Sequence, residues 1–107
     1  MVLLGLTYKA NVADIRESPS IRIKEILESL NIQTETYDPY IKGKYNCLED
    51  AVSGKQAIII GTAHQEFVNG LPIILSNSKV KVVVDGRNCL NKEEIQKLNI
   101  IYKGIGK

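Results

Sequence analysis

Short runs of apolar, often β-branched residues recur along the chain and constrain its fold more than any other feature. Several runs are continuous rather than alternating, as in AIII and VVVD. Strands that are buried on both faces have this pattern, which is typical of parallel sheets. The runs cover residues 2–6, 32–37, 57–61, 80–85 and 100–102. The sequence therefore predicts a sheet of five mostly parallel strands.

The segment after the first run has the pattern of an amphipathic helix. Four apolar residues recur with the spacing that puts them on one face, which we expect to pack on the core. Ser18 is a suitable N-cap and Pro19 a suitable first helical residue. The apolar stripe consists of Ile23, Ile26, Leu27 and Leu30.

Two shorter helices are predicted in the middle of the chain. One covers residues 48–53, with Gly54 as its C-terminal stop. The other lies within residues 65–75, where we expect Gly70 and Pro72 to interrupt it.

A last helix is predicted to begin at Asn91, whose partner Glu94 forms a box-like N-terminus. Strands and helices thus alternate throughout. This order predicts an α/β fold, a three-layer αβα Rossmann-like sandwich around a mostly parallel five-stranded sheet. At 107 residues the chain fits a single domain, residues 1–107.

The bulk composition excludes several classes of protein. The chain is 44% hydrophobic and 24% charged, with a net charge of +2, and contains no run of basic residues that would suit nucleic acid. No apolar segment approaches the length of a membrane span, and the N-terminus lacks the features of a signal peptide. We therefore expect a cytoplasmic protein that binds neither nucleic acid nor membrane.

The two cysteines, Cys47 and Cys89, are far apart and form no C-x-x-C pair. The sequence therefore indicates neither a zinc site nor a redox motif. We expect two small apolar side chains in a reducing compartment, although the sequence leaves a disulfide between them open. Neither has the neighbours that activate a nucleophilic thiolate.

Charged residues follow the predicted strands at their carboxyl ends, where ligands bind in open parallel sheets. Lys9 and Arg16 lie in the long segment after the first strand, and Arg87 follows the fourth. Three cations at one edge would suit an anionic substrate. The alternative is that Asp14 or Glu17 pairs with Arg16 while Lys9 is solvated.

Other chemistries are less well supported. The G-x-G-x-x-G fingerprint of dinucleotide sites is missing after Gly5, so Asp38 is only a weak candidate for a ribose-binding carboxylate and more often starts a turn before proline. The sole histidine, His64, begins an H-x-E pattern, but the P-C-x-x-C of zinc deaminases is absent. We expect His64 to form hydrogen bonds at the start of a helix. Gly86 would let a ligand approach the backbone closely.

Read together, several blocks resemble the C-terminal domain of the UDP-glucose/GDP-mannose dehydrogenase family, over nearly the whole chain. The first block, an aromatic-Lys pair followed by D-x-R-E-S-P, is highly specific. The blocks are GLTYKANVADIRESPS, YDPY, AIIIGTAHQEF, VVVDGRN and YKGIGK.

The resemblance implies a larger enzyme with an N-terminal NAD-binding domain and a helical central region. Such an enzyme oxidises the C6 hydroxyl of a nucleotide sugar twice, with NAD as cofactor, through a catalytic cysteine upstream of this part. It implies that this chain is the nucleotide-sugar-binding domain, inactive alone. The first block is most similar to enzymes for UDP-N-acetylmannosamine, with UDP-glucose as the alternative. We expect a homo-oligomeric full-length enzyme and a monomeric isolated domain.

By the same resemblance, Tyr8 and Lys9 contact the nucleotide sugar and Arg87 holds its nucleotide part. Arg16 matches an arginine that reaches the cofactor across the interdomain cleft, although Asp14 and Glu17 could equally hold it structurally. A stand-alone nucleotide-binding or interaction module remains the hypothesis from another class.

Overall fold

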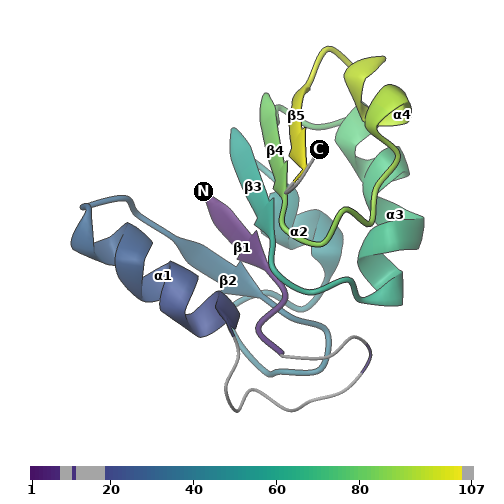
Figure 1. Cartoon of the computed structure of the whole chain (residues 1–107). Helices are drawn as coiled ribbons and strands as arrows, with labels where there is room; N and C mark the ends of the chain where they lie inside the picture. The colour runs from purple at the N-terminus through teal and green to yellow at the C-terminus, as the bar shows by residue number, and fades with distance from the viewer. Residues whose placement is uncertain (8–10, 12–18, 105–107) are drawn as a thin grey trace.

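Five parallel strands form one sheet in the order β2-β1-β3-β4-β5 (Figure 1). The computed structural model describes residues 1–7, 11 and 19–104. The predicted parallel sheet is confirmed, with four strands shorter than their apolar runs and β5 extending two residues beyond its run. Their bounds are Val2–Leu4 (β1), Glu35–Tyr37 (β2), Ala57–Ile60 (β3), Val82–Asp85 (β4) and Ile101–Gly104 (β5).

Four helices connect the strands and form the outer layers of the sandwich. The chain moves from β1 to β2 in one direction and from β2 through β5 in the other, so right-handed crossovers place α1 on one face and the other helices on the opposite face. Figure 1 shows α2, α3 and α4 grouped together, with α1 apart from them. The helices are Pro19–Ser29 (α1), Leu48–Val52 (α2), Gln65–Ser76 (α3) and Lys92–Gln96 (α4). The predicted α/β class is confirmed.

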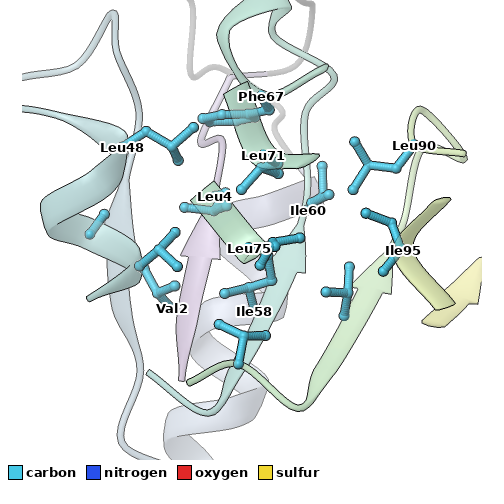
Figure 2. Packing of buried hydrophobic residues seen from close by; sticks show 14 of the residues in the cluster. Val2, Leu4, Leu48, Ile58, Ile60, Phe67, Leu71, Leu75, Leu90 and Ile95 are labelled. Carbon is cyan, nitrogen blue, oxygen red and sulfur yellow. The ribbon is translucent and has the colours of Figure 1, made fainter. Parts of the chain in front are cut away.

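The hydrophobic core lies between the sheet and helices α2 to α4 (Figure 2). Alternate strand residues point into it, because successive side chains leave a strand on opposite faces. The helices contribute Phe67 and Leu71 from α3 and Ile95 from α4, all fully buried. The strand residues of the core are Val2, Leu4, Tyr37, Ile58, Ile60, Val83 and Tyr102.

The apolar stripe of α1 is only half covered, which corrects the expectation that it faces a core. Ile23 and Leu27 are partly buried, whereas Ile26 is 48% and Leu30 64% exposed. Helix α1 lies on the β2 side of the sheet, and β1 and β2 have three residues each, so the surface available to it is narrow. The predicted first helical residue, Pro19, is confirmed, while its predicted N-cap, Ser18, lies outside the described residues.

The predicted interruption of α3 at Gly70 and Pro72 is wrong, because the helix continues through both. Gly70 faces Leu48 of α2, and a Cβ there would lie 3.4 Å from Leu48 Cδ2, an ordinary van der Waals distance. Pro72 removes one backbone donor, but Leu71 and Leu75 on either side are buried in the core. Tertiary packing thus outweighs the low helix propensity of the two residues.

The residues predicted to mark the ends of the short helices are confirmed, with each helix one residue shorter at that end than predicted. Asn91 precedes α4, and its Oδ1 accepts a hydrogen bond from the Glu94 amide at 3.0 Å. Gly54 follows α2 with a φ of +74°, the left-handed conformation that favours glycine after a helix.

A charged cluster stabilises the amino end of β2. The Glu35 carboxylate accepts hydrogen bonds from Lys44 and, at 2.8 Å, from the Tyr45 hydroxyl, and it forms a 2.9 Å ion pair with Lys55. Both lysine ammonium groups also lie over the Tyr45 ring, 5.3 and 5.0 Å from its centroid. The hydrogen bonds from Lys44, Lys55 and Tyr45 lower the pKa of Glu35 from 4.5 to about 2.

This pKa shift predicts an acid-sensitive contribution to stability. Because the folded-state pKa of Glu35 lies below its unfolded value of 4.5, the stabilisation is complete above pH 4.5 and is lost as the pH falls towards 2. Glu35→Gln should therefore be less stable than wild type at pH 7, with the difference shrinking to nothing near pH 2. Urea unfolding of both proteins across this range measures it. A difference independent of pH would contradict the assignment.

Candidate functional site

The carboxyl ends of the five strands form the edge where the sequence places its polar groups. The strand order reverses beside β1, which has β2 on one side and β3 on the other. In open α/β sheets the crevice beyond such a switch point is the usual ligand site. Four residues mark this edge: Gly5 after β1, Asp38 after β2, Gly61 after β3 and Asp85 at the end of β4.

A buried histidine–aspartate pair connects three of these strand ends. His64 is fully buried and Asp38 is 3% exposed. His64 Nε2 lies 2.8 Å from Asp38 Oδ2, which also accepts a hydrogen bond from the Leu6 amide at 2.7 Å. The Tyr40 amide donates to Asp38 Oδ1 at 2.8 Å, so the same carboxylate shapes the turn at Pro39. The Asp38 carboxylate thus forms its hydrogen bonds within the protein, to His64 and to two backbone amides.

The other ring nitrogen of His64 holds a residue of the segment after β1. The Asn11 amide donates to Nδ1 at 2.8 Å, so Nδ1 carries no proton and Nε2 carries the proton that faces Asp38. Thr7 Oγ1 lies 3.1 Å from Nε2. Asn11 Oδ1 in turn accepts from the Gln65 amide at 2.9 Å, at the start of α3. His64 therefore fixes both Thr7 and Asn11.

Beside this pair, the segments that follow β1 and β3 pack closely together. Gly5 has a φ of +94°, and a Cβ there would lie 2.6 Å from Thr62 Cβ and 2.7 Å from Thr62 N. Thr62 Oγ1 donates to the Thr7 carbonyl at 2.5 Å. Only glycine satisfies both the conformation and the space at position 5.

At the end of β4, a tight turn presents Arg87 to the same edge. A Cβ on Gly86 would lie 2.8 Å from the Ile60 carbonyl oxygen, which accepts a hydrogen bond from the Gly86 amide at 3.0 Å. Gly86 therefore allows the close approach of β3. The expectation that it lets a ligand approach the backbone stays a prediction. Arg87 Nε donates to the Gly61 carbonyl at 3.1 Å, so the side chain extends from β4 across the end of β3 towards the switch point.

Elsewhere the described residues offer less chemistry. A hollow of about 460 Å³ between α2 and α3, lined by Glu49, Ile73, Lys79 and neighbours, lies near the C-terminal ends of these helices and therefore far from the carboxyl edge. Within residues 1–7, 11 and 19–104 no group of three or more His, Cys, Asp or Glu side chains could hold a metal. No helix in this part of the chain is long and apolar enough to cross a membrane.

Comparison with known proteins shows which family this chain belongs to. The sequence profile described as the UDP-glucose/GDP-mannose dehydrogenase family, UDP binding domain, matches residues 2–92. The chain belongs to this family. It corresponds to the C-terminal, UDP-binding domain of a dehydrogenase, as its sequence blocks predicted.

Curated relatives support this membership over the full chain. The UDP-N-acetyl-D-mannosamine dehydrogenase of Pyrococcus horikoshii is 35% identical over 108 residues, which cover 100% of this chain and 25% of the relative. UDP-glucose 6-dehydrogenase YwqF of Bacillus subtilis is 29% identical, with 100% and 27% covered. The chain thus spans about a quarter of the length of these relatives.

Solved structures of the family have the same fold. The structure of UDP-D-ManNAc dehydrogenase from Pyrococcus horikoshii matches with a TM-score of 0.85 and 36% identity, over 98% of this chain and 25% of that one. The UDP-N-acetyl-mannosamine dehydrogenase Cap5O from Staphylococcus aureus matches with a TM-score of 0.78 and 31% identity, over 98% and 25%.

The structure describes only some of the residues that the sequence analysis singled out. Arg87 lies at the carboxyl edge, next to the end of β3. Tyr8, Lys9 and Arg16, with Asp14 and Glu17, lie outside the described residues. His64 forms hydrogen bonds at the start of α3 as expected.

The cysteines differ from each other more than the sequence suggested. Both carry free thiols. Cys47 is exposed at the N-cap of α2, contrary to the expectation of a buried apolar side chain. Burial, together with Asp85, raises the pKa of Cys89 to about 12, so its thiol stays protonated at neutral pH. A protonated, partly buried thiol such as that of Cys89 is not set up as a nucleophile.

Sequence reasoning missed three residues that shape this edge: Thr7, Asn11 and Thr62. Their contacts with His64 and with one another join positions more than fifty residues apart, which a local pattern does not show. One local signal existed for Asn11, because asparagine tolerates the left-handed conformation that it adopts, with a φ of +62°.

The contact between Gly5 and Thr62 predicts a graded series of alanine variants. Gly5→Ala adds both a clash and a strained φ, so it should lower the free energy of unfolding by at least about 2 kcal/mol. Gly54→Ala adds a strained φ of +74° without a neighbour within 4 Å and should lower it by about 1 kcal/mol. Gly43→Ala, in open space, is the neutral control. Urea unfolding ranks the three, and equal losses at positions 5 and 54 would contradict the clash.

The buried pair predicts a large effect of removing its imidazole. His64→Ala leaves Asp38 buried with fewer donors and should lower the free energy of unfolding by about 3 kcal/mol. His64→Asn keeps an acceptor near the position of Nδ1 and should be less harmful. Chemical denaturation followed by circular dichroism measures both. A loss below about 1 kcal/mol for His64→Ala would show that the pair is dispensable.

Proposed function

We propose that this chain is the nucleotide-sugar-binding domain of an NAD-dependent UDP-sugar 6-dehydrogenase. The enzyme would oxidise the C6 hydroxyl of a UDP-hexose to the uronate in two steps. The family match over residues 2–92 carries the proposal. UDP-N-acetylmannosamine is the favoured substrate, because the relative with 35% identity is named for it, and UDP-glucose is the alternative, named for a relative with 29% identity.

The geometry of the carboxyl edge supports a role in binding an anion. Arg87 extends across the end of β3 beside the switch point, and a guanidinium offers a rigid fork of donors that suits a diphosphate. In this proposal Arg87 binds the nucleotide part of the substrate, while Tyr8 and Lys9 bind the sugar and phosphate oxygens. Arg16 would reach the cofactor. Arg87, Tyr8 and Lys9 would orient the substrate without forming a covalent bond to it.

The sequence of this chain lacks the glycine-rich fingerprint of a dinucleotide site. Gly5, the glycine directly after β1, packs against Thr62, where a Cβ would lie 2.6 Å from the threonine Cβ. The next glycine in the sequence is Gly43. NAD would therefore bind mainly to the N-terminal domain of the longer enzyme, which would also supply the catalytic cysteine with the central helical region.

Several further properties follow from this proposal. Residues 1–107 would form one domain of a longer, cytoplasmic enzyme. This domain alone would be inactive, because the catalytic cysteine and the main NAD site would lie in the other domains. The intact enzyme would be a homo-oligomer, whereas this chain alone would be monomeric. A stand-alone nucleotide-binding module is the competing proposal. It requires an open reading frame without a dinucleotide-binding domain upstream.

Calorimetric titration of the chain with UDP, UDP-N-acetylmannosamine and NAD tests the proposal. We expect UDP and the UDP-sugar to bind and NAD to give no heat. Arg87→Ala should weaken UDP binding about tenfold or more, since a charge-assisted contact to phosphate is lost. Lys9→Ala should also weaken it.

The matched control is Arg22→Ala, which removes an exposed arginine of α1. It should leave UDP affinity unchanged. NAD binding tighter than UDP binding would overturn the proposal, as would an equal loss of UDP affinity in Arg22→Ala and Arg87→Ala. Absence of UDP binding by the wild-type chain would show that these residues form no nucleotide site of their own.

A further inference from the structure

We propose that Asp85 is a positioning residue for Arg87 and that Tyr102 on β5 completes the arrangement. The inference rests on the proposed function, in which Arg87 binds the nucleotide. Asp85 itself would touch no ligand, because its side chain is fully buried. Its role would be to hold the turn that carries the arginine.

The Asp85 carboxylate is the centre around which this turn folds. Its Oδ1 accepts a hydrogen bond from the Arg87 amide at 3.1 Å, and its Oδ2 accepts one from the Leu90 amide at 2.9 Å. The Cys89 thiol lies 3.7 Å from Oδ1. Carboxylates hold amide donors more strongly than neutral acceptors do. One side chain thus fixes the backbone on both sides of residues 88 and 89.

Arg87 is therefore held at two points. Its backbone amide is bound to Asp85, and its Nε is bound to the Gly61 carbonyl at 3.1 Å. Gly86 rests directly on the Ile60 carbonyl, which prevents the turn from shifting towards β3. Asn88 has a φ of +53°, which reverses the chain after the arginine. With both ends fixed, the side chain loses little further freedom on binding a ligand.

Tyr102 secures the carboxylate from the neighbouring strand. Its hydroxyl donates to Asp85 Oδ2 at 2.7 Å, and the side chain is 4% exposed. Burial, with the hydrogen bond to Asp85, raises the pKa of Tyr102, so the phenol stays protonated and remains a donor. Removal of this hydroxyl leaves the Asp85 carboxylate one donor short. It changes nothing on the surface of the site.

A double-mutant cycle distinguishes positioning from general stabilisation. If Tyr102 acts through Arg87, Tyr102→Phe should weaken UDP binding by itself, about threefold to tenfold. In that background the effect of Arg87→Ala should shrink by the same factor, to about threefold or less, because the arginine is already misplaced. In the wild-type background Arg87→Ala should have its full effect of about tenfold. Affinities are measured by calorimetry at a temperature where every variant is folded.

Tyr37→Phe is the matched control for this cycle. Tyr37 is a second buried tyrosine, 6% exposed, and its hydroxyl donates to Glu66 at 3.1 and 3.2 Å, on the other half of the sheet. Its substitution should leave both UDP affinity and the full effect of Arg87→Ala intact. An effect of Arg87→Ala that is equal in the Tyr102→Phe and Tyr37→Phe backgrounds would overturn the positioning role.

A measurement without ligand separates this inference from the proposed function. Hydrogen exchange by NMR should show faster exchange of the Arg87 and Leu90 amides in Tyr102→Phe and Asp85→Asn, but not in Tyr37→Phe. If Asp85→Asn fails to fold, Tyr102→Phe carries the test. Unchanged exchange at both amides would overturn the inference. Absence of UDP binding by a wild-type chain whose amides respond as expected would instead show that the chain has no nucleotide site of its own and would leave the positioning of Arg87 intact.

Discussion

The buried contact between His64 and Asp38 is the constraint on which the rest of the carboxyl edge depends. One imidazole joins the ends of β1, β2 and β3, because its two nitrogens reach Asp38 and Thr7 on one side and Asn11 on the other. The Asp38 carboxylate also accepts the Leu6 amide. A polar network of this kind in the interior specifies one arrangement, since any other arrangement would leave buried polar groups without partners.

Two close contacts, each made possible by a glycine, form the floor of this edge. Gly5 lies against the backbone and side chain of Thr62, and Gly86 lies against the Ile60 carbonyl. Arg87 then crosses this floor from β4 to β3. Its hydrogen bond to the end of β3 holds the guanidinium in place, so in its proposed role Arg87 would need little reorganisation to bind an anion.

Local patterns in the sequence predicted the elements, while contacts between distant residues had to come from the structure. Continuous apolar runs indicated the parallel strands, and Asn91 marked the start of α4 because helix capping depends on neighbouring residues alone. Gly70 and Pro72 led to a wrong prediction of a helix break, because the packing of α3 on the core outweighs their low helix propensity. The pairing of His64 with Asp38 joins two strand ends that are distant in the sequence, so no local spacing pattern predicts it.

The position of β1 in the sheet has a consequence for how the domain folds. β1 begins at Val2, yet it is an interior strand, and Val2 pairs with both Glu35 and Ile58. The first strand of the chain therefore finds its second neighbour only when more than half of the chain is available. Closing such long loops costs chain entropy before the stabilising contacts form, so folding is slow, as is typical of parallel sheets. Sheet assembly is thus governed by the meeting of distant segments rather than by the speed at which its helices form.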